Sequence, residues 1–214
     1  PEDSRAGLVE SYQDKRIRYV CNATNMGISL SRNKLIEMAR GEYFAVHDHD
    51  DISSPCRFEE EVTYLESHQE VGVVSTWAKG WPRGKVKRKY IHDADIRIDL
   101  THRCSLLHPA AMIRRSVLID NKIRYDGGFS PAEDYALWIA LLPYTKFHNI
   151  PKILYFYRGH QANASKLQYE KMCNCYDKIR TSVEALYPEL CTLYRARKKF
   201  PMNAICWAKR FLGV

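Results

Sequence analysis

One nine-residue run constrains the fold and chemistry of this chain more than any other part of it. It covers residues 43–51, where the strand-like sequence Tyr-Phe-Ala-Val-His is followed by Asp-His-Asp-Asp. Because side chains along a strand alternate between its faces, we expect Asp48 and Asp50 on the same side of the strand's end. Two such carboxylates repel each other unless a cation lies between them. Carboxylate oxygens favour divalent ions such as Mg2+ or Mn2+, which are usually shared with substrate phosphates.

The same run has a simpler interpretation as the start of a helix. Asp51 and Ser53 lie just before residues 56–68, which have helical apolar spacing. An aspartate or serine in this position can cap the free backbone N–H groups of a helix. A cap needs one acid, whereas this run contains three, so we favour the cation site.

Composition predicts a single core with a short appendage. The chain has 214 residues, of which 45% are hydrophobic, and this is enough for one sizeable core. It contains no apolar run close to the roughly 18 residues that span a bilayer, and its first residues do not form a secretory signal. The seven cysteines are an odd number without a Cys-x-x-Cys pair, so we expect a reducing cytoplasm and neither a zinc site nor a disulfide framework.

The net charge of +8 is concentrated in two clusters. Such clusters can serve nucleic acid, anionic lipid or a phosphorylated substrate, or they can be solvated faces. We do not expect nucleic acid, because no recognised binding motif accompanies the charge. The segment 192–214 mixes basic and apolar residues, which predicts either peripheral binding to the inner face of an anionic membrane or a helix packed back on the domain. The clusters are Lys85, Lys87, Arg88 and Lys89, and Arg195, Arg197, Lys198, Lys199, Lys209 and Arg210.

Short apolar runs alternate with amphipathic segments, and this order predicts an α/β layer structure. Strands are expected over residues 17–20, 43–47, 71–76, 109–113 and 152–157, and helices over 28–40, 56–68, 133–142 and from about 167 onward. The buried faces of the first two helices are expected to carry Ile28, Leu35, Ile36 and Ala39, and Phe58, Val62 and Leu65.

Arg32 interrupts the apolar face of the helix expected over residues 28–40. It lies four residues after Ile28 and three before Leu35. An arginine stays charged under all ordinary conditions, so a buried one needs an anion. We expect that anion to be one of the acids after strand 43–47 or a ligand phosphate, unless the side chain reaches past the helix edge into solvent.

A second acidic motif opens the helix expected over residues 133–142. Two glycines, Gly127 and Gly128, precede it, and Asp134 lies four residues before Trp138 on the expected buried stripe. The helix dipole stabilises an ionised carboxylate in the first turn. Asp134 could act as a general base if a substrate hydroxyl lies within hydrogen-bond distance, or it could only cap the helix.

These motifs form an ordered series between about Ser11 and Ser165. The series resembles the landmarks of the inverting family 2 glycosyltransferases of the GT-A fold. Its order and spacing carry the resemblance, because a lone Asp-x-Asp pair is a weak signal. The motifs are Asn25-x-Gly27, Ser31-Arg32-Asn33, Ala39-Arg40-Gly41-Glu42-Tyr43, Asp48-His49-Asp50-Asp51, Pro55-x-Arg57, His108-Pro109 with Met112-x-Arg114, Gly127-Gly128-Phe129 with Glu133-Asp134-Tyr135 and Leu137-Trp138, and Tyr157-Arg158-x-His160 with Asn163-x-Ser165.

The resemblance implies roles for residues on the donor side of a site. Asp48 and Asp50 would bind the metal and the nucleotide diphosphate, with Asp50 the more direct metal ligand. Arg32 would face the nucleotide and this acidic motif. His160 matches a position that either approaches the metal or diphosphate or is structural. The metal would be Mn2+ or Mg2+.

The resemblance also implies roles on the acceptor side. Asp134 would take the proton from the acceptor hydroxyl, Glu133 would shape the acceptor site, and His108 would line it. The implied reaction moves a sugar from a nucleotide-diphosphate sugar to a glycan or lipid-linked acceptor in cell-surface polysaccharide synthesis. We expect the donor to be a UDP-sugar.

The implied fold is a GT-A-like, Rossmann-related mixed sheet flanked by helices over residues 1–165, followed by a basic helical extension over 166–214. The family's first strand, helix and strand, which build the nucleobase pocket, have no counterpart here. We therefore expect that upstream residues belong to the natural protein or that this segment is inactive alone.

Two other classes of function are compatible with the residues. The three acids could belong to a two-metal phosphoryl or nucleotidyl transferase, which would need further carboxylates at the metals. Alternatively, the chain could be a non-catalytic module that docks on a membrane or nucleic acid through its basic tail.

Overall fold

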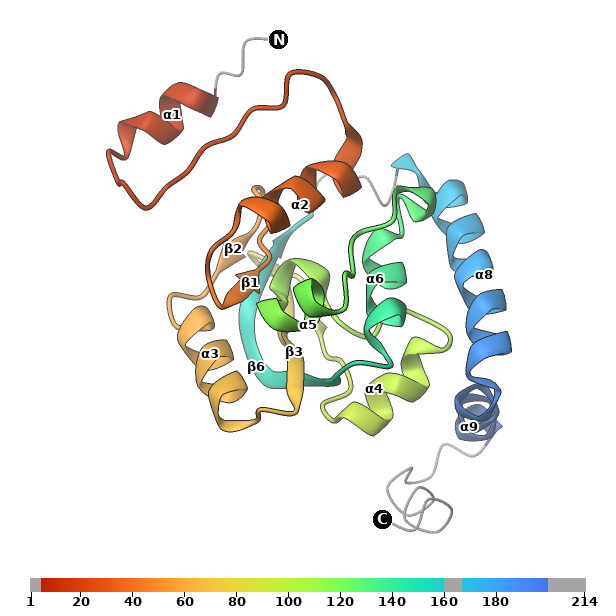
Figure 1. The fold of residues 1–214 in the computed structure, drawn as a ribbon. Helices are drawn as coiled ribbons and strands as arrows, with labels where there is room; N and C mark the ends of the chain where they lie inside the picture. Colours follow the sequence, from red (N-terminus) through yellow and green to blue (C-terminus); the bar gives the residue numbers. More distant parts are fainter. Residues whose placement is uncertain (1–4, 160–166, 200–214) are drawn as a thin grey trace.

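The structure is a computed structural model that describes residues 5–159 and 167–199. Figure 1 shows a curled sheet flanked by helices, with α8 (Tyr169–Leu186) running along one side of the molecule. The chain then turns into α9 (Pro188–Lys199). The mixed α/β architecture and the helical C-terminal segment confirm the fold class predicted from the sequence.

In the described residues, six strands form one mixed sheet in the order β1-β5-β3-β6-β2, with β4 paired to β3. The pair β3–β6 is parallel, and the other pairs are antiparallel. The strands are β1 (Tyr43–Ala45), β2 (Ile52–Ser53), β3 (Val71–Trp81), β4 (Val86–Lys87), β5 (Met112–Arg114) and β6 (Lys146–Arg158).

The long parallel pair β3–β6 forms the centre of the sheet. Its register shifts between Thr76, which faces Ile150, and Trp77, which faces Ile153. Pro151 lies in this irregularity, where its missing N–H does not interrupt a regular ladder. Beyond it, β6 continues to Arg158 and brings its C-terminal end beside β2 and the acidic run.

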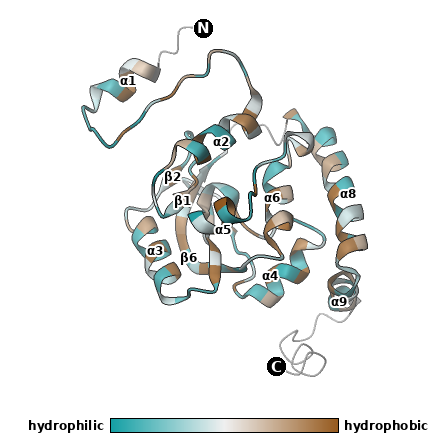
Figure 2. Ribbon diagram, in the orientation of Figure 1, coloured by the Kyte–Doolittle hydropathy of each residue, from teal (hydrophilic) through white to brown (hydrophobic). Residues whose placement is uncertain are grey.

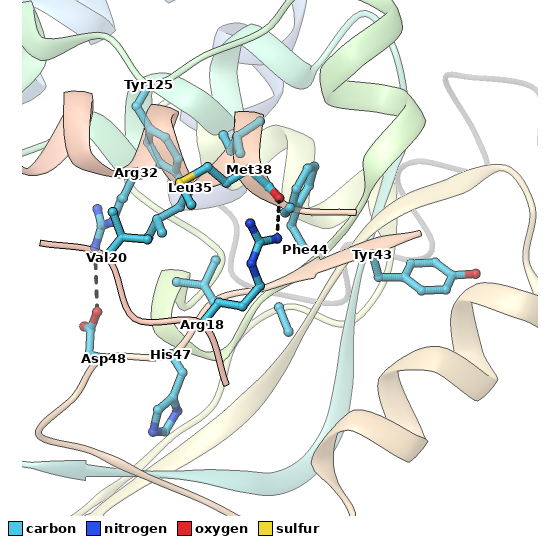
Figure 3. Close-up of a pocket in the computed structure, with 14 residues that line it drawn as sticks. Arg18, Val20, Arg32, Leu35, Met38, Tyr43, Phe44, His47, Asp48 and Tyr125 are labelled. Carbon is cyan, nitrogen blue, oxygen red and sulfur yellow. Dashed lines mark hydrogen bonds and ion pairs between the residues drawn. The ribbon is translucent and has the colours of Figure 1, made fainter. Parts of the chain in front are cut away.

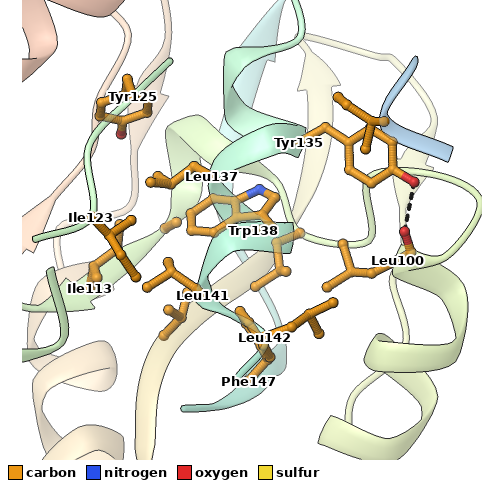
Figure 4. Packing of buried hydrophobic residues seen from close by; sticks show 14 of the residues in the cluster. Leu100, Ile113, Ile123, Tyr125, Tyr135, Leu137, Trp138, Leu141, Leu142 and Phe147 are labelled. Atoms are coloured by element: carbon orange, nitrogen blue, oxygen red, sulfur yellow. Dashed lines mark hydrogen bonds between the residues drawn. The ribbon is translucent and has the colours of Figure 1, made fainter. Parts of the chain in front are cut away.

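The main core lies around helix α6 (Glu133–Leu141), whose sequence is apolar on nearly all sides. Figure 4 shows Trp138 among Leu137, Leu141 and residues from β5 and α4. A helix that is hydrophobic all round is stable only when buried. The first turn of α6, which carries Glu133 and Asp134, is therefore held on a rigid element.

The remaining helices cover the sheet and the core. They are α1 (Arg5–Ser11), α2 (Gly27–Met38), α3 (Arg57–Ser67), α4 (Asp93–Leu100) and α5 (Arg115–Asp120), with short 3-10 turns at His108–Ala110 and Gly127–Phe129. Figure 2 shows hydrophilic and hydrophobic residues alternating along α3 and α8, as expected of helices that bury one face.

Several local predictions are wrong, among them part of the strand predicted over residues 109–113, where His108–Ala110 forms a 3-10 turn. Residues 17–20 form no strand: they run as an irregular segment, and Ile17 and Tyr19 are exposed. On α2 only Ile36 of the predicted apolar face is buried, while Ile28 and Leu35 are 46% and 56% exposed. Among the residues that the structure describes, no strand pairs with the backbone of residues 17–20. Leu35 borders a pocket and not the core.

On α3 the helix is correctly predicted but its buried face is only partly so. Leu65 is buried, whereas Phe58 is 49% exposed and its neighbour Arg57 is fully buried. Arg57 turns inward because it has acceptors there, including Glu61 on the same helix face.

The described part of the basic tail packs on the domain. Arg197 of α9 pairs with Asp95 of α4 at 2.6 Å, and the Tyr194 ring stacks on His102. This contact favours the alternative in which the tail packs back, for residues 188–199; residues 200–214 lie outside the described part. Among the described helices, none has the length and apolar character needed to cross a bilayer.

Candidate active site

The backbone around the acidic run is fixed by Arg57. Its guanidinium donates to the Val46 carbonyl at 2.7 Å, to Ser53 Oγ at 2.9 Å and to Glu61 Oε1 at 3.0 Å. The Val46 N–H in turn donates to the Ala111 carbonyl at 2.9 Å. Both ends of the 46–53 segment are therefore held by one buried cation.

Asp51 and Ser53 do not cap the helix that follows them. The N-cap position of α3 is Cys56, which makes no side-chain cap hydrogen bond. Asp51 Oδ1 instead accepts the backbone N–H of Arg158 at 2.7 Å. The capping interpretation is therefore wrong, and Asp51 ties the acidic run to the end of β6.

Arg32 joins the two acidic motifs. Its guanidinium donates to Glu133 Oε1 at 2.8 Å and lies 3.6 Å from Asp48 Oδ1. Its side chain is only 18% exposed and that of Glu133 only 7%. One acid after the strand is thus a partner of Arg32, as the sequence predicts, and Glu133 is a second partner that the local pattern does not reveal. Figure 3 shows Arg32 and Asp48 pointing toward each other.

Asp134 lies in the first turn of α6, next to this ion pair. Its Oδ1 accepts the Tyr135 backbone N–H at 2.7 Å, and the Cys104 thiol lies 3.8 Å from its Oδ2. Burial, with a smaller contribution from the Glu133 charge, raises the pKa of Asp134 to about 6, against the opposing effects of the Tyr135 N–H and Arg32. A carboxylate with this pKa is suited to accept a proton near neutral pH.

Asp134 borders a pocket of about 220 Å³ that is also lined by His108, Tyr155, Lys87 and Lys89. His108 Nε2 lies 2.8 Å from the Tyr125 hydroxyl. Burial, aided by the charge of Arg32, holds the pKa of His108 well below its usual value. His108 is therefore a neutral wall of the pocket that Asp134 also borders.

A larger pocket, of about 440 Å³, borders Arg32. Figure 3 shows its lining, which includes Arg18, Leu35, Asp48 and Tyr125. Its volume is in the range of small-molecule sites.

Two tyrosines connect the larger and smaller pockets. Tyr125 borders the larger pocket and meets His108 of the smaller one. Tyr155 borders the smaller pocket, and its hydroxyl accepts the Asp48 N–H at 3.3 Å. Asp48 and Asp134 therefore lie in neighbouring pockets.

Carboxylates crowd the acidic run. Partial burial, together with the charges of Asp51 and Asp50, raises the pKa of Asp48, although Arg32 opposes the shift. No group of three or more His, Cys, Asp or Glu side chains able to hold a metal occurs in the parts of the chain that the structure describes. His160 lies outside the described residues.

Tyr155 is a site residue that sequence reasoning does not single out. It lies in the segment predicted as a strand. Tyr157, two residues later on the same strand, borders the same pocket. The period-two alternation of a strand could have placed these two rings on one face. Nothing in the local sequence indicates that the Tyr155 hydroxyl meets the backbone of Asp48.

The fold is that of GT-A glycosyltransferases. The chain resembles the crystal structure of S. aureus TarS in complex with UDP-GlcNAc, with a TM-score of 0.69 and 19% sequence identity over 86% of this chain and 55% of that one. It also resembles TarS in complex with UDP, with a TM-score of 0.60 over 87% of this chain and 63% of that one. At this identity the likeness concerns the fold alone.

The sequence places the chain more narrowly. The family model described as Glycosyl transferase family 2 matches residues 2–121, and the chain belongs to this family. The uncharacterized glycosyltransferase MJ1057 of Methanocaldococcus jannaschii is 28% identical over 97% of this chain and 70% of its own length. The O-antigen biosynthesis glycosyltransferase WbnJ of Escherichia coli is 26% identical over 65% of this chain and 56% of its own length.

Proposed function

We propose that this chain transfers a sugar, with inversion, from a nucleotide-diphosphate sugar to a hydroxyl of a glycan or lipid-linked acceptor in cell-surface polysaccharide synthesis. The observation that carries the proposal is the Arg32 contact, which joins the Asp48 run to Glu133 and thereby to Asp134. The TarS complexes with UDP-GlcNAc and UDP support a UDP-sugar as donor. The name of WbnJ supports a role in surface polysaccharide synthesis.

Asp134 is the proposed base. With its pKa raised to about 6, it is mostly ionised at neutral pH and can accept the proton of an acceptor hydroxyl in the 220 Å³ pocket. As the proton leaves, the hydroxyl oxygen forms a bond to the anomeric carbon, and the bond from that carbon to the diphosphate oxygen breaks. Attack from the face opposite the leaving group inverts the configuration, and no covalent enzyme intermediate is needed.

We further propose that the acidic run binds a divalent ion on the donor side. Partial burial, with smaller contributions from the charges of Asp51 and Asp50, raises the pKa of Asp48 although Arg32 opposes the shift, and a bound cation would favour the ionised carboxylate. Mg2+ commonly takes one or two protein carboxylates and completes its shell with substrate phosphates and water. Asp48 and Asp50 would hold Mg2+ or Mn2+, and the ion would stabilise the negative charge that develops on the leaving diphosphate. His160 remains a predicted further ligand.

Arg32 has a positioning role in this proposal. Because it is bound to Glu133 and Asp48 at once, it fixes the acidic run relative to the first turn of α6. Glu133 would shape the acceptor site through this bond.

The alternatives of another class are less well supported. Membership of a glycosyltransferase family favours sugar transfer over a two-metal phosphoryl transferase, and it also favours an enzyme over a purely binding module. We propose a location in the cytoplasm, at the inner face of the membrane where lipid-linked acceptors are found.

The test is a panel of nucleotide sugars incubated with the full-length natural protein, with release of free nucleoside diphosphate as the readout. Each donor is assayed with Mn2+, with Mg2+ and with a chelator, in the presence of mixed glycan acceptors. We expect release from one donor class, dependent on the metal and on acceptor. No release from any donor would contradict the proposed function.

A further inference from the structure

Two lysines that follow the tight β3–β4 hairpin border the pocket around Asp134. Gly80 and Gly84 approach so closely that a Cβ on Gly84 would lie 2.6 Å from the Gly80 Cα, so only glycine fits at this turn. The turn folds β4 back along β3 and places Lys87 opposite Ala78, which also borders the pocket. Lys89 follows two residues later and borders the same pocket.

Both lysines are held in place by neighbouring groups. Lys89 donates from Nζ to the Cys104 carbonyl at 2.7 Å, and its own carbonyl accepts the Trp77 indole N–H at 3.1 Å. The Lys87 ammonium lies 4.1 Å from the centre of the Tyr157 ring. Two cations are therefore fixed at the pocket that contains the proposed base.

Neither ammonium is neutralised by a salt bridge within residues 5–159 and 167–199. The charge of Asp51 opposes the lowering of the Lys87 pKa, but among the described residues no salt bridge joins the two side chains. Loss of hydration, together with the nearby charge of Lys89, lowers the pKa of Lys87. An anion bound between the two lysines would relieve this repulsion.

A second hollow, which shares Lys89 with this pocket, also carries arginines. They are Arg88 and Arg103. Arg103 is paired with Asp99 at 2.9 Å, whereas Arg88 rests near the Trp77 ring without a salt bridge in the described part of the chain. The larger pocket beside Asp48 has no lysine in its lining.

We propose that the acceptor is an anionic molecule and that Lys87 and Lys89 bind its phosphate or carboxylate group while Asp134 receives the proton of its hydroxyl. This inference rests on the proposed function and adds the chemical class of the acceptor. The pocket of about 220 Å³ is smaller than the roughly 300 Å³ at which whole-ligand sites begin. The charged group and the reacting hydroxyl therefore belong to the same sugar unit or to adjacent ones.

The test compares matched acceptors, using the full-length natural protein and the donor identified by the nucleotide-sugar panel. The acceptors are methyl glycosides of glucose, galactose and mannose, each as the neutral sugar, the 6-phosphate and the uronate. The variants are K87Q, K87Q/K89Q and the control K85Q, which removes a lysine of the same cluster that borders neither hollow. K87Q alone keeps the Lys89 bond to Cys104, so it remains informative if the double variant folds poorly.

We expect the phosphorylated or uronate members to be used in preference to the neutral ones. K87Q/K89Q should raise the acceptor KM about 10- to 100-fold, the range for lost charge-assisted hydrogen bonds, while donor KM stays unchanged. K85Q should behave as the natural sequence. Preference for phosphate over uronate, or the reverse, identifies the source of the charge.

Equal use of neutral acceptors, or an unchanged acceptor KM in both lysine variants, would overturn the inference. A rise confined to the donor KM would also overturn it, because the lysines would then serve the donor diphosphate. Failure of every nucleotide sugar to release diphosphate would contradict the proposed function itself, so the two failures are distinguishable.

Discussion

Ionisation of Asp134 should set the acidic limb of the pH–rate profile. Its pKa is raised from 3.8 to about 6, first by burial and then by the charge of Glu133. Only the ionised form accepts a proton, so kcat/KM should fall as the pH falls through about 6. About nine molecules in ten carry the ionised form at pH 7, and about one in ten at pH 5.

Two substitutions should move this limb in opposite directions. Glu133→Gln removes a charge that raises the pKa of Asp134, so the limb should move to lower pH. Arg32→Gln removes a cation that lowers the same pKa, so the limb should move to higher pH. As a scale, unit charges about 8 Å apart at an effective dielectric constant of about 20 interact by about 2 kcal/mol, or about one and a half pH units, so shifts on the order of one pH unit are expected.

The assay is nucleoside diphosphate release between pH 4.5 and 8 at constant ionic strength. His47→Gln is the control, because His47 is a histidine beside the acidic run that could titrate in this range, although burial lowers its pKa. The limb should persist in this control. A limb near pH 4 in the natural sequence, or shifts of the same sign in Glu133→Gln and Arg32→Gln, would refute the reasoning.

Three further predictions concern stability, the metal and the membrane. Arg57→Met should lower the free energy of unfolding by about 3–5 kcal/mol in urea denaturation, because fully buried Glu61 loses its partner; a loss below about 1 kcal/mol would contradict this. Chelation should abolish nucleoside diphosphate release and added Mn2+ or Mg2+ should restore it, whereas an unaffected rate would rule out the proposed metal site. Removal of residues 200–214 should reduce flotation with anionic liposomes, because residues 188–199 pack against α4 through Arg197 and Asp95. Equal flotation would contradict the membrane proposal.

The sequence predicts the elements whose signal is local. Helices α2, α3 and α6 and strand β1 are close to their predicted ranges, because apolar spacing and a following turn or glycine define each one. The prediction of a strand over residues 17–20 is wrong. A short, mainly apolar segment forms a strand only when another strand pairs with it. Apolar spacing alone does not supply that partner.

Long-range pairing explains one further difference in the sheet. The predicted strand over residues 152–157 is part of the longer β6, which begins at Lys146. In the local sequence Pro151 indicates the start of a strand. The parallel pairing of β6 with β3 accommodates this proline at an irregularity in the register, so the strand continues through it.

The site follows the same division between local and long-range signals. The need of Arg32 for an anion is visible from helical spacing, and Asp48 is among the partners expected for it. Its stronger bond to Glu133 joins residues 101 positions apart in the sequence, and local spacing cannot indicate it. The basic cluster that contains Lys87 and Lys89 is visible in the sequence. The hairpin in which Gly80 and Gly84 touch brings these lysines to the pocket of Asp134, and the sequence does not show this.

The most direct test of a shared site for the acidic run and Asp134 separates nucleotide binding from transfer. UDP binding with Mn2+ is measured by calorimetry in Asp50→Asn and Asp134→Asn, alongside sugar transfer and circular dichroism to verify folding. Both substitutions should abolish transfer, and only Asp50→Asn should weaken metal-dependent UDP binding. Weakened UDP binding in Asp134→Asn, with intact binding in Asp50→Asn, would contradict the proposed division of roles.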